Sequence, residues 1–186
     1  MLKRARTLSL SLVLTCIVVG GLFVVGSSPK GPVLPYVRHT RKIETPLTFD
    51  GRVVGVADGD TITVLDSSNQ EHRIRLQGID APEKGQAFGT RSKQNLSEAV
   101  FDKVVVIQWS KHDRYRRIIG KVLLGGNDVC LEQVRAGMAW HYKDYQAEQT
   151  PEDQILYAAA EDAARSARIG LWIDPNPMPP WDFRHR

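Results

Sequence analysis

The strongest constraint on the fold of this chain is a period-two alternation of apolar and polar residues in three successive segments. These segments lie within residues 47–68 and 71–79 and are rich in Val, Ile and Thr. Alternation places the apolar side chains on one face of an extended strand. Asp58-Gly59 and Ser67-Ser68-Asn69 are turn-forming sequences that separate the segments. The pattern therefore predicts three strands joined by tight turns.

The rest of the chain adds two strands and three helices. The strands are predicted at 103–109 and 117–126, and the helices at 88–102, 130–140 and 151–170. Three strands, a helix, two strands and then helices are typical of a small closed barrel. We therefore expect an α+β fold that is mainly β. It would be a five-stranded OB-fold barrel with about three packed α-helices, preceded by an N-terminal hydrophobic helix.

The N-terminal residues 1–28 have the order of an export signal, in which basic residues precede an apolar run and small residues follow it. The mostly apolar run covers residues 8–25 and is close to the shortest length that spans a bilayer, roughly 17–25 residues. Two interpretations stay open: a signal anchor that is not cleaved, and a signal peptide cleaved near residue 28. A buried core helix is the structural alternative, but basic residues at the very start fit targeting better. The basic N-terminus favours the cytoplasmic side, so both predict an exported, periplasmic or extracytoplasmic protein.

The remaining boundaries follow from composition and charge. We expect a linker at 29–45, a folded domain at 46–174 and a proline-rich tail at 175–186. The first 44 residues hold seven of the 25 Lys and Arg residues and one of the 21 acids, so the rest of the chain has a net charge of −2. A local basic site, and not the overall field, must therefore hold any anionic ligand. We expect a monomer.

Two carboxylates stand at predicted strand ends. Asp60 opens one strand and Asp80 closes the next, and antiparallel neighbours bring such positions to one rim of a barrel. Hard cations such as Ca²⁺ prefer carboxylate, carbonyl and water oxygens as ligands. The alternative is structural: Asp60 belongs to a turn, and Asp80 with Glu83 has the spacing of a helix N-cap and its capping-box partner.

Two arginines give the acids a possible chemistry. Arg75 precedes Asp80 by five residues, and Arg117 begins the fifth predicted strand. Guanidinium groups suit the non-bridging oxygens of a phosphodiester, and a carboxylate such as Glu83 can take a proton from an attacking water. An odd separation puts Arg75 and Asp80 on opposite faces of a strand unless a bulge intervenes. Surface arginines paired with nearby acids are therefore the open alternative.

Three motifs in one order carry a family resemblance. "DGDT" at 58–61, "RLQGIDAPE" at 75–83 and "DRYRR" at 113–117 resemble the staphylococcal-nuclease, or thermonuclease-like, family. The similarity runs from about Phe49 to Trp172. It implies an OB-fold barrel, a Ca²⁺ cofactor and an endonuclease that hydrolyses phosphodiester bonds of DNA and RNA.

The resemblance also implies roles for individual residues. By motif position the calcium ligands are Asp60, Asp80 and the backbone carbonyl of Ala81. Glu83 matches the general base, Arg75 and Arg117 match the phosphate-contacting arginines, and Tyr115 matches a nucleotide-binding tyrosine. A tyrosine that packs on the barrel surface is the alternative for Tyr115.

The chain departs from the family pattern at two positions. Ala81 stands where the staphylococcal type has Thr, which leaves a backbone carbonyl available. Arg116 replaces the glycine of D-[KR]-Y-G-R, and a left-handed turn there would cost Arg about 1–2 kcal/mol. A reshaped loop would leave open whether Arg116 or Arg117 faces the phosphate, and we expect Arg117 by position.

The sequence thus predicts an exported or membrane-tethered nuclease that acts on DNA, RNA or both. The alternative is a catalytically inactive OB-fold module that binds nucleic acid or protein at the membrane. A degenerate module would have lost part of the charged set, whereas this chain has all five members: Asp60, Arg75, Asp80, Glu83 and Arg117.

Overall fold

Residues 46–186 are described by the structure, a computed structural model. The predicted hydrophobic helix, the export signal at 1–28 and the linker at 29–45 lie outside the described residues. Within residues 46–186, no helix is both long enough and apolar enough to span a membrane.

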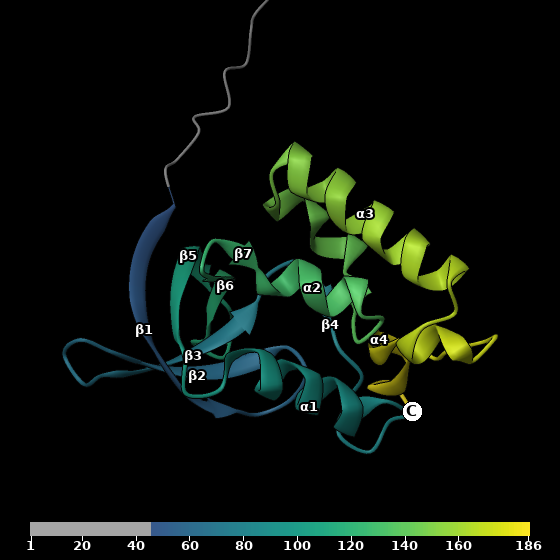
Figure 1. Ribbon diagram of the computed structural model, residues 1–186, viewed down its shortest axis with the longest axis horizontal. Coiled ribbons are helices and arrows are strands. Elements are labelled where there is room, and N and C mark those ends of the chain that lie inside the picture. Colours follow the sequence, from purple (N-terminus) through teal and green to yellow (C-terminus); the bar gives the residue numbers. More distant parts are fainter. Residues whose placement is uncertain (1–45) are drawn as a thin grey trace, which may run out of the picture. The chain divides into compact units, whose positions relative to one another are not determined.

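Five long strands form a barrel, as the sequence predicts (Figure 1). The sheet order is β3-β2-β1-β5-β6-β7, and a parallel pairing of β3 with β6 closes the barrel, with Ile74 opposite Ile118. The strands are β1 (Leu47–Val56), β2 (Thr61–Asp66), β3 (Glu71–Leu76), β5 (Val104–His112), β6 (Ile118–Leu124) and the two-residue β7 (Asn127–Asp128).

The alternating residues fill the interior of the barrel. Val53, Ile62, Ile74, Ile107 and Val122, which come from the five long strands, are fully buried. The register of β1 shifts between Val53 and Gly55, and that of β5 shifts between Trp109 and Lys111. Such irregularities bend a strand and increase its twist, which helps a five-stranded sheet to close on itself.

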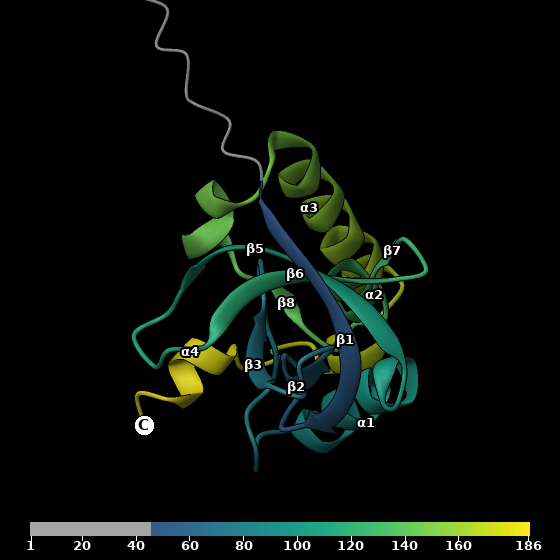
Figure 2. The ribbon, with the colours of Figure 1, turned by 90° about the vertical axis from the view of Figure 1, so that its left-hand side faces the viewer.

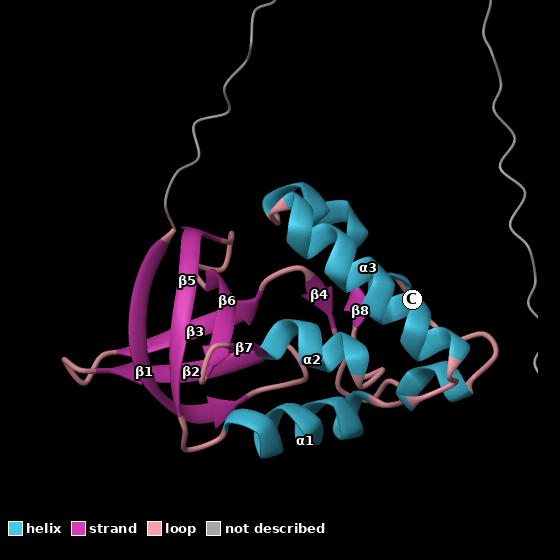
Figure 3. Cartoon of the chain, turned by 45° about the horizontal axis from the view of Figure 1, so that its top comes forward, coloured by secondary structure: helices cyan, strands magenta, loops and turns pink. Residues whose placement is uncertain are grey.

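Three helices pack together beside the barrel, and this confirms the predicted number (Figure 3). They are α1 (Gly89–Val100), α2 (Val129–Arg135) and α3 (Pro151–Ser166), and α2 contacts both of the others. The Asp128 side chain caps α2 by accepting hydrogen bonds from the backbone N–H groups of Cys130 and Leu131. Thr150 caps α3, and Pro151 occupies its first turn.

Two local features differ from the sequence predictions. Asp80 does not close β3, because a turn through Gln77 and Gly78 ends that strand, and Asp80 lies on a separate short strand, β4 (Ile79–Asp80). β4 pairs with β8 (Trp140–His141). The proline-rich tail, for which the sequence predicts no helix, contains the short helix α4 (Pro180–Phe183). Two 3₁₀ turns, η1 (Lys143–Glu148) and η2 (Gly170–Ile173), flank α3 along the chain.

Close packing around Gly59 gives a test of how the β1–β2 turn is held. A Cβ atom at Gly59 would lie 1.8 Å from Ser92 Oγ and 2.8 Å from Ala81 Cβ. Gly59→Ala should therefore lower the free energy of unfolding by about 1–3 kcal/mol, measured by urea denaturation. Gly55→Ala is the matched control, because its Cβ would meet only Thr63 atoms at 3.5 Å. Equal losses in both variants would contradict this account of the turn.

Candidate active site

A cavity of about 590 Å³ opens at one rim of the barrel. Its walls come from the β1–β2 turn, the segment after β3, the loop after β5 and the C-terminal tail. All seven residues singled out from the sequence line it: Asp60, Arg75, Asp80, Ala81, Glu83, Tyr115 and Arg117. The fold therefore brings three distant segments of the chain to one place.

Asp60 is positioned by the turn that joins β1 to β2. The backbone N–H of Ala57 donates to the carbonyl of Thr61 at 2.9 Å, and the N–H of Asp60 donates to Asp58 Oδ1 at 3.1 Å. The Asp60 side chain is only 6% exposed, and its Oδ2 accepts a hydrogen bond from the Ala81 N–H at 2.8 Å. The segment is thus a turn, as the structural alternative has it, and it also directs a carboxylate into the cavity.

Arg75 joins the two buried acids. Its Nη2 lies 3.1 Å from Asp60 Oδ2 and 2.8 Å from Asp80 Oδ1. Its Nη1 donates to the carbonyls of Leu76 at 3.0 Å and Ile79 at 2.8 Å. The strand spacing left open whether Arg75 and Asp80 converge. They do so because the turn at Gly78, which has a φ of +75°, reverses the chain between them.

The cluster is short of positive charge near Asp60. Burial, with help from the neighbouring acids Asp58 and Asp80, raises the pKa of Asp60 to about 7, although Arg75 and the Ala81 N–H oppose the shift. For Arg75, burial lowers the pKa, but Asp60 and Asp80 outweigh that effect and the net shift is upward. A further positive charge at this place would therefore be stabilised.

Glu83 lies at the mouth of the cavity and outside any helix. The Glu83 N–H donates to Gln86 Oε1 at 2.9 Å, and α1 begins only at Gly89. The alternative of a capping box starting at Asp80 is therefore wrong. Asp80 is 1% exposed and lies on β4, where its carboxylate contacts guanidinium groups instead of helix N–H groups.

The loop after β5 holds Arg117 toward the site. Asp113 accepts hydrogen bonds from the backbone N–H of Arg117 at 2.9 Å and from its Nε at 2.7 Å. Burial raises the pKa of Asp113, but the hydrogen bonds from Arg117 lower it more. Arg117 Nη1 lies 3.5 Å from Thr61 Oγ1, beside Asp60. Arg117 lines the cavity whereas Arg116 does not, and Arg116 keeps the left-handed turn with a φ of +65°.

Tyr115 stands at the outer edge of the cavity and is 64% exposed. The guanidinium carbons of Arg114 and Arg117 lie 4.8 Å and 5.6 Å from the centre of its ring. The ring therefore packs on arginines, and it stays accessible to a ligand in the cavity.

Sequence reasoning missed one residue of the site, Arg184. Its Nη2 lies 2.8 Å from Asp80 Oδ2, and its Nη1 lies 2.6 Å from Glu83 Oε1. Figure 2 shows α4 and the C-terminus on the side of the barrel where β3 ends. The tail has no periodic pattern, and its Pro and Trp residues before Arg184 are a weak signal that gives no position.

The donor set at Asp60 and Asp80 fits a hard cation. Among residues 46–186, no group of three or more His, Cys, Asp and Glu side chains is arranged to hold a metal ion by itself. Two carboxylates and a carbonyl, with water completing the shell, are nevertheless ordinary ligands for Ca²⁺. Burial is the largest cause of the upward shift in the pKa of Asp60, and a cation bound beside this carboxylate would favour its ionised form. The residues present therefore fit a divalent cation.

Known proteins resemble this chain in sequence. The profile of the family described as staphylococcal nuclease homologue matches residues 73–174. A Haemophilus influenzae protein named uncharacterized endonuclease is 42% identical over 135 residues, which cover 73% of this chain and 72% of that protein. A Shigella flexneri micrococcal nuclease is 41% identical over 145 residues, which cover 73% and 80%. An Escherichia coli protein named uncharacterized endonuclease is 44% identical over 137 residues, which cover 73% and 85%.

The raised pKa of Asp60 predicts that the site weakens the fold. A carboxyl whose pKa is 3.8 when unfolded and about 7 when folded contributes its full stability below pH 3.8 and loses it as the pH rises to about 7. Asp60→Asn does not titrate. In cation-free buffer, the free energy of unfolding of Asp60→Asn should therefore exceed that of wild type by an amount that grows between pH 3.8 and about pH 7, to about 1–3 kcal/mol. Urea denaturation of both proteins at several pH values tests this. A difference in the free energy of unfolding that stays constant from about pH 4 to about pH 8, or an Asp60→Asn variant that is less stable than wild type above about pH 7, would contradict it.

The left-handed conformation of Arg116 predicts a second local cost. Arg116→Gly should raise the free energy of unfolding by up to about 1 kcal/mol, because glycine accepts a φ of +65° without strain. Arg114→Gly is the control: Arg114 is not among the described residues with positive φ, so its replacement should bring no gain. The same urea experiment compares the two, and an equal response of both variants would contradict the prediction.

Proposed function

This chain belongs to the staphylococcal nuclease homologue family, and on that premise we propose that it is a Ca²⁺-dependent endonuclease that hydrolyses phosphodiester bonds of DNA, RNA or both. The observation that carries the proposal is the single cavity lined by Asp60, Asp80, Glu83, Arg75 and Arg117. Acids for a cation, a further acid for a proton and guanidiniums for a phosphate are what this hydrolysis needs.

Asp60, Asp80 and the carbonyl of Ala81 would hold the cation. When bound, Ca²⁺ supplies positive charge that stabilises the phosphoryl oxygens. Asp60 and Asp80 are buried carboxylates. The Ala81 N–H donates to Asp60 Oδ2 at 2.8 Å, so this hydrogen bond joins the β1–β2 turn to the segment that contains Asp80 and Ala81 before any ligand binds. Such preorganisation lowers the cost of assembling the site.

Glu83 is the acid best placed to take a proton from an attacking water. Its side chain is more exposed than those of Asp60 and Asp80, so water reaches it from the mouth of the cavity. A carboxylate with its ordinary access to solvent can accept the proton during attack and release it afterwards.

Arg75 and Arg117 are proposed to hold the phosphate. The carbonyls of Leu76 and Ile79 fix the Arg75 fork, and Asp113 fixes the Arg117 side chain through Nε. Two guanidiniums fixed in advance can stabilise the charge that grows on the non-bridging oxygens as water attacks phosphorus in line.

An unpaired strand is the proposed form of the substrate. Attack requires access to the backbone, and the exposed ring of Tyr115 offers a face on which a base can stack. Because residues 45–186 have a net charge of −2, affinity should come from this local site and not from the charge of the whole domain.

We also propose, from the order of residues in segment 1–28, that the protein acts outside the cytoplasm. The expectation of a monomer is a separate prediction. The segment would either remain as an anchor through residues 8–25 or be cleaved near residue 28. A membrane-tethered binding module without catalysis is the second candidate. The observation in its favour is the ion pair of Arg184 with Glu83, which occupies the proposed base.

The role of Glu83 predicts a loss of turnover in Glu83→Gln. Cleavage of single-stranded DNA, duplex DNA and RNA is measured with Ca²⁺, with Mg²⁺ and with a chelator. Wild-type activity should require Ca²⁺, and Glu83→Gln should lower kcat by about 10²–10⁴-fold, since general-base catalysis contributes that much. Glu98→Gln, an exposed site on α1, is the matched control and should keep wild-type activity. A folded wild-type protein that cleaves none of these substrates would favour the binding module instead.

A further inference from the structure

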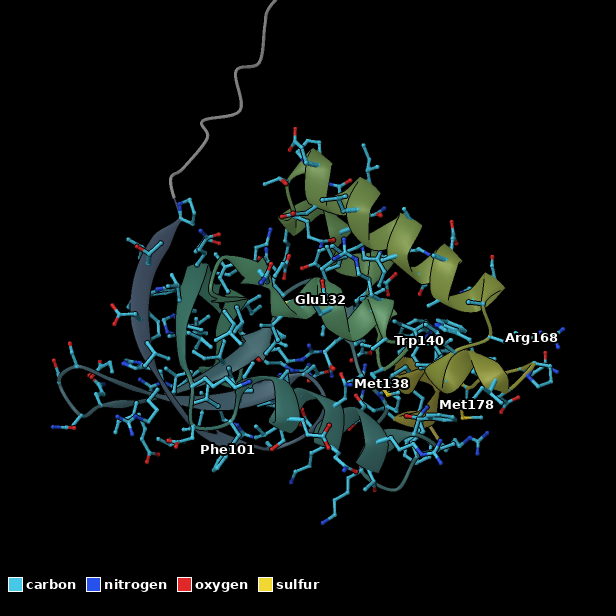
Figure 4. The ribbon with its side chains drawn as sticks, in the orientation of Figure 1. Phe101, Glu132, Met138, Trp140, Arg168 and Met178 are labelled. Atoms are coloured by element: carbon cyan, nitrogen blue, oxygen red, sulfur yellow. The ribbon has the colours of Figure 1, made fainter. Side chains whose placement is uncertain are left out.

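The C-terminal arm, residues 178–186, is anchored beside the site by aromatic packing. The Trp181 ring lies parallel to Tyr142 at 5.5 Å and meets the Trp140 ring edge-on at 6.2 Å. Gln86 Nε2 donates to the carbonyl of Met178 at 2.6 Å, and Pro180 is buried. Figure 4 labels Trp140 and Met178 in this region. The arm is thus attached to the segment that carries Glu83 and to β8.

This anchoring brings the Arg184 guanidinium into contact with both Asp80 and Glu83. Asp80 Oδ2 accepts from Arg184 Nη2 at 2.8 Å, and Asp80 Oδ1 accepts from Arg184 Nη1 at 3.2 Å. The same Nη1 donates to Glu83 Oε1 at 2.6 Å. Arg75 Nη2 already binds Asp80 Oδ1 at 2.8 Å, so guanidinium groups occupy both oxygens of Asp80.

A divalent cation and Arg184 therefore need the same two oxygens of Asp80. Ca²⁺ binds carboxylate oxygens at about 2.3–2.6 Å, where it would share lone pairs with a guanidinium and be repelled by its charge. Arg75 is only 15% exposed and two carbonyls hold it, whereas the Arg184 side chain is 38% exposed. Moving the Arg184 guanidinium into water therefore costs less free energy than moving the Arg75 guanidinium.

We propose that Arg184 competes with the divalent cation for the Asp80 carboxylate, so that the C-terminal arm sets the cation affinity of the site. The inference rests on the proposed function, because it assumes that Asp80 is a cation ligand. Arg184 also lines the substrate cavity, so a displaced guanidinium stays within reach of an anionic phosphodiester. Phosphodiester binding should therefore draw Arg184 from the acids and strengthen cation binding.

The test is calorimetric titration of Ca²⁺ into the full chain without nucleic acid. Arg184→Ala should bind Ca²⁺ about tenfold more tightly than wild type. In wild type the ion pair between Arg184 and Asp80 must break before Ca²⁺ can bind Asp80, whereas the variant has no such ion pair. Arg186→Ala removes the same charge two residues away. Arg186 is exposed and forms no ion pair with another residue of the described range, so its variant should keep the wild-type Kd. An unchanged or weaker affinity in Arg184→Ala would overturn the proposal.

Two further measurements separate the possible failures. Arg184→Lys keeps the positive charge but cannot make the same forked pair of hydrogen bonds, so its Kd for Ca²⁺ should lie between those of wild type and Arg184→Ala. This variant replaces Arg184→Ala in the test if the alanine variant does not fold. With a phosphorothioate dinucleotide present, wild-type affinity for Ca²⁺ should rise more than that of Arg184→Ala. Equal Ca²⁺ binding by all variants contradicts the competition alone, whereas no Ca²⁺ binding by any folded variant contradicts the proposed function as well.

Discussion

The site depends on a guanidinium that bridges two carboxylates almost out of contact with water. Arg75 lies within 3.1 Å of Asp60 and 2.8 Å of Asp80, and both acids are buried. Burying such charges costs free energy unless each finds a partner with good geometry. Arg75 only partly offsets the burial of Asp60, and this is why the pKa of Asp60 stays raised. The buried carboxylate weakens the fold when it is ionised, and a bound cation would relieve that cost.

Closure of the barrel places the second arginine beside this cluster. The parallel pairing of β3 with β6 sets Arg75 opposite Ile119, two residues beyond Arg117. A ligand that contacts both guanidiniums therefore contacts segments about 40 residues apart in the sequence. The rim has little freedom to spread, because strand pairing holds one side and the Asp60–Ala81 hydrogen bond holds the other. The barrel thus fixes the distances on which the proposed recognition of phosphate depends.

The fold could be predicted from the sequence because its signals are local. The alternation in the first three strands and the residues that end the helices can be recognised without knowledge of distant contacts. The structure confirms the predicted barrel and the three helices packed beside it. Strand periodicity could not place Arg75 relative to Asp80, since a two-residue turn at Gln77 and Gly78 decides it. Arg184 was missed for a different reason. Its position depends on Trp181 stacking on Tyr142, a contact between segments that no local pattern links.

The arm gives the cluster a second guanidinium partner that, unlike Arg75, is partly open to water. On the proposed competition, Asp80 keeps a second counter-charge when the site is empty, and the site can still receive a cation when a phosphodiester draws Arg184 away. The most direct measurement of the central claim is equilibrium dialysis of the full chain against radiolabelled Ca²⁺, beside an Asp80→Asn variant. The account predicts one bound ion per chain and a loss of binding in the variant. Absence of binding by the folded wild-type protein, or binding that survives Asp80→Asn, would contradict it.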